Sequence, residues 1–421
     1  MNKIIKYIII LIAANAVGFP TAFAQWLALN SGTTARLHQV YFVDETIGFA
    51  IGGWTSGLIL KTENAGETWN PIYVSNMLYS INFISDSLGY VAGEYGLILK
   101  TSDKGNNWVE INSPTSQQIN TIHFIDSLTG FIGTGGFGGA PGYGKVYKTI
   151  DGCINWVEVS PDLMYVVKDI YFRNNTDGVM LSGIYCSATS DTGNTWQVDT
   201  LLFPNTIDVG GQDISFMNNT LGFMTGGAVI NNTLNAGAFL KTIDGGNNWA
   251  LTVFDSIYRF QGLFMIDENI GYIIGSNQVT ESGTILKTID GGETWRTQIN
   301  SGLPAYMFSV FCTSSEVCYA VGDDGVIIKT VNGGVGIHEA DVNEDLRIYP
   351  NPAANSITLE IQLIGQQSSV KIYDVRGQQI FETVNNKQKK LSIDVSGFAA
   401  GLYVIQLQSQ QGVVSKKFMK R

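Results

Sequence analysis

The chain has 421 residues, with 48 Gly and only 9 Pro, a composition that is typical of an ordered all-β protein with many tight turns and excludes a disordered one. Its formal net charge is −11 at pH 7, and residues 345–421 carry ten Lys/Arg against five Asp/Glu, which leaves −18 on residues 25–344. So acidic a main body argues against nucleic acid and anionic lipid as ligands.

The first 24 residues have the pattern of a cleavable secretion signal. Lys3 and Lys6 give a basic start, residues 8–14 form a short apolar run, and Ala-Phe-Ala at 22–24 is a small-x-small cleavage site. The apolar run is too short for a stable membrane span, and an uncleaved anchor is the alternative. We therefore expect an exported protein without its first 24 residues.

Seven copies of one unit follow, and each copy contains two hairpin-like segments. The first is an alternating apolar run and a turn, then usually Gly and an aromatic residue, as in Val40-Tyr41-Phe42 and Gly48-Phe49. The second holds a Thr-x-Asp/Asn-x-Gly turn, in which Cys153 replaces the Gly of one copy, and Trp follows the turn in six copies. Period-2 apolar patterns around polar turns predict β-hairpins. The Asp or Asn residues of these turns are Asn64, Asp103, Asp151, Asp191, Asp244, Asp290 and Asn332.

Two hairpins in each copy make a four-stranded sheet, and seven such sheets arranged radially make a β-propeller over residues 25–335. The seventh copy lacks both its Trp and its fourth strand, whereas residues 25–30 have the composition of that strand. We predict that residues 25–30 complete the last blade, because ring closure removes the exposed sheet edges of an open array. A non-closed solenoid is the alternative.

The Thr-x-Asp-x-Gly-x-x-Trp unit resembles the Asp-box (BNR) repeat of secreted propellers. Together with the Gly-Tyr hairpin, it resembles the propeller of the photosystem II assembly and stability factor family, from residue 25 to about residue 336. The Asp residues recur in every blade, and we interpret them as structural, not catalytic or calcium-binding. A short polar side chain can accept backbone hydrogen bonds at a tight turn, and Gly supplies a positive φ.

Function is expected where the copies differ. In the usual propeller chain path, the loops between the second and third strands share one face with the inter-blade loops. That face would carry the insertions at 133–144, 226–237 and 275–283 as loops, and the long inter-blade loop at 197–211. The predicted ligand-binding residues are Trp54, Tyr95, Phe137, Tyr143, Arg36, Lys168 and Arg259, and further polar residues at the channel mouth are His38, Glu94, Asp169, Asp213 and Asp323.

Exposed aromatic rings with polar neighbours suit stacking on sugars or anchoring of a peptide. We therefore expect a binding protein with a glycan or protein ligand, acting as a monomer without a cofactor. The alternative is a polysaccharide-active glycoside hydrolase or sialidase-like enzyme, in which Asp169 and Asp213 would act as a catalytic pair. A three-arginine carboxylate site of the sialidase kind is barely possible, because the propeller has only Arg36, Arg173, Arg259 and Arg296.

The cysteine and histidine residues predict one local disulfide and no metal site. Cys312 and Cys318 flank one predicted hairpin turn, so a local disulfide is expected there. Cys153 and Cys186 lie in different blades, and no pairing is predicted for them. The three His residues have no metal-ligand spacing, and no metal site is expected.

The tail is predicted to be a small Ig-like β-sandwich over residues 345–421, after a polar linker at 336–344. Its strands are expected at 356–361, 370–373, 391–395 and 402–406, with turns between them. The tail resembles the type IX (Por) secretion C-terminal sorting domain of Bacteroidetes-type bacteria. The matching residues are Tyr349-Pro350-Asn351-Pro352, Tyr373-Asp374-Val375-Arg376-Gly377, Ser396-Gly397, Ala400-Gly401-Leu402-Tyr403 and Lys416-Lys417.

This resemblance implies that the type IX secretion machinery recognises residues 345–421 and carries the chain across the outer membrane. It also implies removal of the tail, followed by release or attachment at the cell surface. A carbohydrate-binding sandwich is the alternative for the tail. Assembly assistance to another protein is a third function, suggested by the propeller's resemblance.

Overall fold

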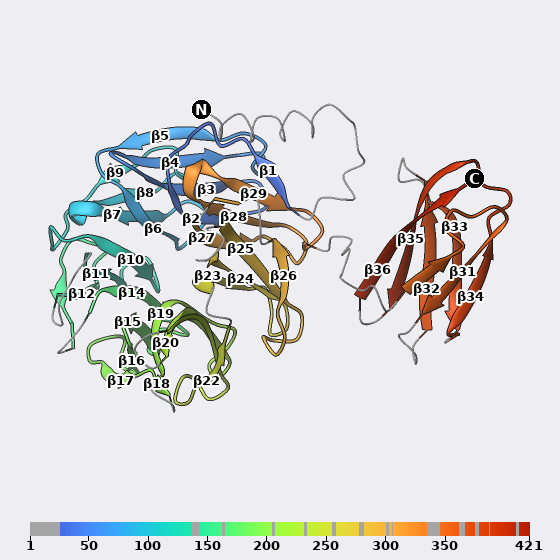
Figure 1. Ribbon diagram of the computed structural model, residues 1–421. Helices are drawn as coiled ribbons and strands as arrows, with labels where there is room; N and C mark the ends of the chain where they lie inside the picture. The colour runs from blue at the N-terminus through green and yellow to red at the C-terminus, as the bar shows by residue number, and fades with distance from the viewer. Residues whose placement is uncertain are drawn as a thin grey trace. The chain divides into compact units, whose positions relative to one another are not determined.

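The structure is a computed structural model, and its described residues form two compact units, one over 26–334 and one from 346 to 421 (Figure 1). The expected signal peptide, Phe137 and the linker lie outside the described residues. No helix in the described part of the chain is long and apolar enough to cross a membrane. The described ranges are 26–136, 143–161, 165–203, 207–230, 234–254, 258–277, 282–299, 303–304, 306–334, 346–361, 367–374, 379–386, 388–409 and 412–421.

Seven antiparallel sheets in the described residues form the blades of the first unit, as the repeat predicts. Each blade takes its strands in order from the inner to the outer strand. Blade 1 consists of β2 (Leu37–Phe42), β3 (Gly48–Gly53), β4 (Gly57–Thr62) and β5 (Asn70–Val74), and blade 2 consists of β6 (Leu78–Phe83), β7 (Gly89–Gly93), β8 (Ile98–Thr101) and β9 (Val109–Glu110). Blade 3 consists of β10 (Ile119–Phe124), β11 (Gly130–Thr134), β12 (Val146–Thr149) and β13 (Val157–Glu158). Blade 4 consists of β14 (Val167–Phe172), β15 (Gly178–Ser182), β16 (Tyr185–Thr189) and β17 (Gln197–Thr200).

The remaining blades include the point of ring closure. Short 3₁₀ turns join the second and third strands of blades 2 and 7, at η2 (Glu94–Gly96) and η3 (Asp323–Gly325). The strands are β18 (Leu202–Phe203), β19 (Ile207–Phe216), β20 (Gly222–Ile230), β21 (Leu234–Thr242) and β22 (Ala250–Val253) in blade 5, β23 (Tyr258–Met265), β24 (Gly271–Asn277), β25 (Ser282–Thr288) and β26 (Arg296–Ile299) in blade 6, and β27 (Met307–Cys312), β28 (Cys318–Gly322), β29 (Ile327–Thr330) and β1 (Leu27–Leu29) in blade 7.

The N-terminal strand closes the ring, as the sequence predicts. β1 pairs antiparallel with β29, with Ala28 opposite Ile328. Trp26, just before β1, meets the ring of Tyr272 edge-on at 5.8 Å and is buried. Trp26 thus supplies the indole that the seventh copy lacks, so both the missing strand and the missing Trp come from the other end of the propeller.

The core consists of aromatic rings stacked between neighbouring blades. Phe49 of β3 stacks on Phe83 of β6 with 5.0 Å between centroids, and Trp108 meets both rings edge-on at 6.1 Å. The same three-ring arrangement recurs where Phe131 meets Phe172 and Trp196. Buried aromatic rings carry large apolar areas and favour offset or edge-to-face contacts, so these clusters bind each sheet to the next.

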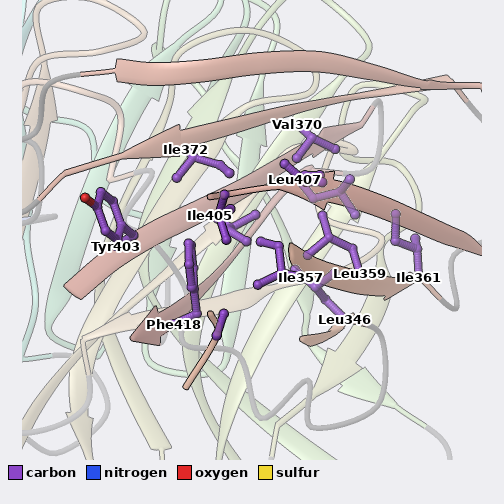
Figure 2. Close-up of a cluster of buried hydrophobic side chains, with 13 residues drawn as sticks. Leu346, Ile357, Leu359, Ile361, Val370, Ile372, Tyr403, Ile405, Leu407 and Phe418 are labelled. Atoms are coloured by element: carbon purple, nitrogen blue, oxygen red, sulfur yellow. The ribbon is translucent and has the colours of Figure 1, made fainter. Parts of the chain in front are cut away.

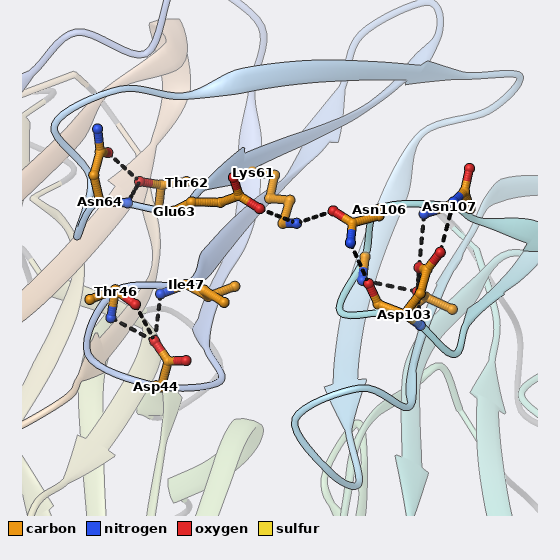
Figure 3. Close-up of polar contacts among 12 residues, drawn as sticks. Asp44, Thr46, Ile47, Lys61, Thr62, Glu63, Asn64, Asp103, Asn106 and Asn107 are labelled. Carbon is orange, nitrogen blue, oxygen red and sulfur yellow. Dashed lines mark hydrogen bonds and ion pairs between the residues drawn. The ribbon is translucent and has the colours of Figure 1, made fainter.

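The Asp-box turns lie between the third and fourth strands and satisfy their own polar groups. In blade 6, Thr288 Oγ1 donates to Asp290 Oδ1 at 2.8 Å, and Asp290 Oδ1 accepts the Thr294 N–H at 2.9 Å. Figure 3 shows the equivalent bonds around Asp103 in blade 2. Hydrogen bonds from Asn107, first from its side chain, lower the pKa of Asp103 to about 2. These contacts agree with a structural part for the turn Asp residues.

Three of the segments expected to be loops are largely strands instead. The insertion at 226–237 extends β20 and β21 into one long hairpin, and the insertion at 275–283 extends β24 and β25. The segment 197–211 contains β17, β18 and the start of β19. These insertions contain no Pro between 207 and 303, so the backbone ladder of each hairpin can continue through them.

The C-terminal unit contains two sheets that pack around one apolar core (Figure 2). Side chains from both sheets, including Leu359, Ile405 and Phe418, are fully or nearly fully buried in it. The sequence predicted four of its strands and missed β30, β33 and β36. One sheet has β30 (Leu346–Tyr349), β31 (Ser356–Ile361) and β34 (Lys390–Asp394), and the other has β33 (Gln379–Asn386), β32 (Gln367–Tyr373), β35 (Gly401–Ser409) and β36 (Gly412–Lys420).

Candidate functional site

Every inner strand of the propeller contains a register shift near its start. In β2, Leu37 is opposite Gly52 and Gln39 is opposite Ile51, so His38 has no paired partner. A β-bulge of this kind re-aims the extra side chain and ends regular pairing. The residues at the seven bulge positions are His38, Tyr79, Asn120, Lys168, Gln212, Gln261 and Phe308.

In six of the seven blades, the side chain of the residue after the bulge bonds to the next blade. Gln39 Oε1 accepts the Ile81 N–H at 2.8 Å, and in the same way Ser309 Oγ accepts the Val40 N–H at 3.3 Å. These bonds link the inner strands side to side. The residues at this position are Gln39, Ser80, Thr121, Asp169, Asp213, Gly262 and Ser309, of which Gly262 has no side chain to contribute.

Asp169 and Asp213, the alternative catalytic pair, belong to this linking position. Asp169 Oδ2 accepts the Ile214 N–H at 3.2 Å, and Asp213 Oδ2 accepts the Leu263 N–H at 2.7 Å. Burial, followed by the charge of Asp213, raises the pKa of Asp169 well above its ordinary value. Burial raises the pKa of Asp213 to about 6, against the opposing effect of the hydrogen bond from the Leu263 N–H. Each of these two carboxyl groups therefore links its own blade to the next one.

The predicted binding residues Arg36 and Trp54 meet at the start of blade 1. The Arg36 guanidinium forms a two-point ion pair with Asp323, with Nε to Oδ1 at 2.5 Å and Nη2 to Oδ2 at 3.2 Å. The same guanidinium lies over the rings of Trp54 and Phe308, at 4.8 and 5.1 Å from their centroids. A guanidinium stacks on aromatic faces and pairs with carboxylates in two-point geometry, so Arg36 joins blades 7 and 1.

His38 continues this arrangement into blade 2. Its ring lies 5.1 Å from Phe308 and 4.6 Å from Tyr79, and Tyr79 Oη donates to Glu94 Oε1 at 3.4 Å. Burial and the nearby charge of Arg36 lower the pKa of His38 to about 3, so this imidazole is neutral. Burial and then Glu94 raise the pKa of Tyr79 to about 12. We call Arg36, His38, Trp54, Tyr79, Phe308 and Asp323 the Arg36 cluster.

Three aromatic side chains of the same loops are exposed to solvent. Trp54 is 52% exposed, Tyr95 is 73% exposed, and Tyr306, which stacks on Phe308 at 6.3 Å, is 43% exposed. Tyr95 has a φ of +54° in the turn η2. In the equivalent turn of blade 7, Asp324 adopts a φ of +57°. Asp tolerates the left-handed region, whereas a bulky residue there is strained, and such strain clusters at functional sites.

The structure gives fewer contacts for the other predicted binding residues. Tyr143 is exposed, and its backbone oxygen accepts a hydrogen bond from Gln117 Nε2 at 3.3 Å. Lys168 occupies the bulge position of blade 4 and is half-buried. Arg259 lies in β23 opposite Ser276, but its side chain, like Phe137, is outside the described part of the chain.

Tyr79, Tyr306 and Phe308 were missed by the sequence reasoning. Tyr79 and Phe308 occupy bulge positions, which interrupt the period-2 alternation used to find the strands. Their signal was available, because each of them lies two residues before the Ile or Val that starts a repeat motif.

The structure also bears on metals and cysteines. No group of three or more potential metal ligands occurs in the described residues. Cys312 and Cys318 lie opposite each other on β27 and β28 and form a disulfide. Cys153 and Cys186 are buried free thiols.

Two known families match parts of the chain. Residues 347–421 match the secretion system C-terminal sorting domain. Residues 20–157 match the family described as photosynthesis system II assembly factor YCF48. The propeller is thus YCF48/BNR-like, and it is followed by a Por secretion sorting domain, as the two resemblances in the sequence indicated.

Curated relatives cover only short stretches. The photosystem II assembly lipoprotein Ycf48 of Synechococcus sp. is 32% identical over 99 residues, which are 22% of this chain and 29% of that protein. An endo-acting ulvan lyase of Formosa agariphila is 40% identical over 63 residues, which are 15% of this chain and 12% of the lyase. The chain therefore spans less than a third of the length of either relative.

Solved structures with similar folds cover most of the chain. YCF48 bound to D1 peptide has a TM-score of 0.57 at 20% identity, over 75% of this chain and 100% of that one. YCF48 from Cyanidioschyzon merolae has a TM-score of 0.56 at 19% identity, over 72% and 98%. The GH74 xyloglucanase from Xanthomonas campestris has a TM-score of 0.56 at 10% identity, over 73% and 53%. At these identities the likeness shows the propeller fold alone.

Proposed function

The chain joins a YCF48/BNR-like propeller to a C-terminal secretion sorting domain, and we propose that it is an exported binding protein for an extended polypeptide segment. The ligand would bind over the Arg36 cluster and the exposed rings of Trp54, Tyr95 and Tyr306. The observation that carries this proposal is Tyr95, an exposed aromatic residue held at a φ of +54° where the fold itself accepts Asp.

A polypeptide ligand fits the chemistry of this surface. Trp, Tyr and Arg are the residues most often found at the energetic centres of protein interfaces. The net charge of −18 on residues 25–344 favours a neutral or basic segment over an acidic one. The similar YCF48 structure with a bound D1 peptide supports the same class of ligand. A glycan is the alternative ligand, because a sugar ring can stack on the same aromatic side chains.

The sorting domain supports a site of action outside the cell. A Por secretion sorting domain implies export by the type IX secretion system to the outer surface or the medium. Our proposal adds that residues 1–24 are removed as a signal peptide and that residues 345–421 are removed after export. Mass spectrometry of the secreted protein tests both cleavages, and an intact tail on the secreted form would contradict the second.

The hydrolase alternative keeps one supporting observation, the raised pKa values of Asp169 and Asp213. Shifted pKa values cluster at functional sites. However, both carboxylates already accept backbone N–H groups of the following blade, Asp169 from Ile214 and Asp213 from Leu263, which favours a structural role for the pair. Polysaccharide cleavage that disappears in Asp169→Asn would support the enzyme and overturn the binding-only proposal.

Selection from a phage-displayed random-peptide library tests the proposed function. The full chain and its Trp54→Ala/Tyr95→Asp variant would be used as baits, with a glycan array in parallel. We expect the wild-type chain to enrich a peptide motif that the variant does not enrich. Motifs that are enriched equally by both baits would contradict the proposed surface, and binding only on the glycan array would contradict the polypeptide ligand.

A further inference from the structure

Blade 4 departs from the other blades at two positions that face blade 5. In six blades the second residue of the second strand is aromatic, and the third strand has a Lys before its terminal Thr. Blade 4 has Val179 and Ala188 at these positions. The six aromatic residues are Phe49, Tyr90, Phe131, Phe223, Tyr272 and Tyr319, and the six lysines are Lys61, Lys100, Lys148, Lys241, Lys287 and Lys329.

These side chains fill the space between blades elsewhere. Lys148 Nζ donates to the carbonyl oxygen of Thr192 at 2.6 Å, and Lys329 Nζ donates to that of Ala65 at 2.9 Å. Both carbonyls belong to the Asp-box turn of the following blade. Tyr319 stacks on Phe42 of that following blade, with 4.0 Å between centroids. A ring and a lysine stem thus close the junction above each turn.

Arg173 replaces both groups between blades 4 and 5. Its Nη1 donates to the Gly245 carbonyl at 2.6 Å, and its guanidinium lies 5.1 Å from the ring centroid of Phe216. Arg173 follows β14, so it reaches this junction from a different strand than the ring and the lysine of the other blades. A cavity of about 700 Å³ lies there, lined by Val179, Ala188 and Arg173 among others.

The lining of the cavity is chiefly polar. Gln197, Thr200 and Asn248 contribute amide and hydroxyl groups, and Trp249 contributes an aromatic ring. Burial raises the pKa of the Cys186 thiol in the same wall to about 12, so the thiol is neutral at physiological pH.

We propose that this cavity is a binding site for a neutral saccharide of one or two rings. Its volume falls within the range of about 300–1,000 Å³ that is usual for small-molecule sites. A sugar offers hydroxyl groups to the amides of Gln197 and Asn248 and to the Thr200 hydroxyl, and an apolar face to Trp249. Asp199 in the wall and the acidic propeller disfavour an anionic ligand. The site lies in blades 4 and 5, away from the Arg36 cluster.

The repeat itself supplies the variant that tests the site. Val179→Phe/Ala188→Lys restores the ring and the lysine stem that close the other junctions, and Ala188→Lys alone is a milder version. Glucose, galactose, mannose, xylose, cellobiose and glucuronate would be titrated into the full chain, followed by saturation-transfer NMR and calorimetry. Trp54→Ala is the matched control, because it alters the Arg36 cluster, over which the peptide is proposed to bind, and leaves this cavity unchanged.

We expect saturable binding of at least one of the neutral sugars, with glucuronate weaker than glucose. Binding should weaken by at least about tenfold, or about 1.4 kcal/mol, in each folded cavity-filling variant and stay unchanged in Trp54→Ala. Absence of saturable binding for all the neutral sugars would overturn the proposal. Equal binding by a folded Ala188→Lys chain, or tighter binding of glucuronate, would also overturn it.

Discussion

The two ends of a blade differ in how regularly their residues repeat from blade to blade. At the Asp-box end, Thr288, Asp290 and Thr294 bond to one another and to their own backbone. At the other end, Trp54 and Tyr95 are exposed, and Tyr95 adopts a φ that suits Asp better. The first arrangement repeats because every blade needs the same turn, and the second differs between blades. We infer that the Asp-box end is scaffold and that the opposite end binds the ligand.

Removal of a ring from the repeated core should have the largest effect on stability. Phe131→Ala deletes a fully buried ring that stacks on Phe172 and contacts Trp196, and we expect a loss of about 3–5 kcal/mol. Trp54→Ala, at the exposed end, should cost less than about 1 kcal/mol. Urea unfolding of both variants measures the difference. Similar losses in the two would break the division between scaffold and binding surface.

The substitution Asp213→Asn should give the next largest effect, on the pH dependence of stability. The pKa of Asp213 is about 6 in the folded protein, above the ordinary 3.8, because this residue is buried. The folded state therefore binds more protons than the unfolded state between these values, and stability falls as pH rises from about 4 to about 6. Asp213→Asn should flatten this fall, because its amide has no titrating proton. The midpoint of urea unfolding, measured across that pH range, would show the difference. An unchanged pH dependence in Asp213→Asn would contradict the raised pKa of Asp213.

Substitution of Asp290 should destabilise the protein less, by an amount that depends on the residue introduced. Asp290→Ala leaves the Thr294 N–H and the Thr288 hydroxyl without their acceptor, and we expect a loss of about 1–2 kcal/mol. Asp290→Asn should cost much less, because Asn64 makes the equivalent bonds in blade 1 and donates to Thr68 Oγ1. Thermal unfolding distinguishes the two, and an equal loss in both would argue that the charge matters more than the hydrogen bonds.

Tyr95→Asp should change stability least, by no more than about 0.5 kcal/mol in either direction. Asp324 occupies the same left-handed position in blade 7 without difficulty. The substitution should nevertheless weaken ligand binding, since it removes an exposed ring. A clear loss of stability would instead show that Tyr95 belongs to the scaffold.

The fold could be predicted because each repeat has a local sequence pattern that specifies its strands and turns. The Thr-x-Asp-x-Gly turn, the apolar alternation and the split seventh copy lie in local sequence, and ring closure by β1 follows from them. The extended hairpin of β20 and β21 was not predicted, because Gly and Asn between residues 226 and 237 are ambiguous between loop and strand.

The candidate site could be predicted only in part. Arg36 and Trp54 were identified because they precede and follow recognisable strands. Their partner Phe308 was not, because the bulge moves it out of the alternating pattern and the contact joins residues at opposite ends of the propeller sequence. The cavity beside Arg173 was missed for a related reason, since Val179 and Ala188 create it together from two strands.

Affinity for a library-selected peptide is the most direct test of the division between the two ends. Dissociation constants would be measured by calorimetry for the wild-type chain, Trp54→Ala/Tyr95→Asp and Asp290→Ala, each at a temperature where all are folded. We predict that the first variant binds at least about tenfold more weakly, while Asp290→Ala binds as the wild type does. Unchanged affinity in Trp54→Ala/Tyr95→Asp, or a loss confined to Asp290→Ala, would contradict the account.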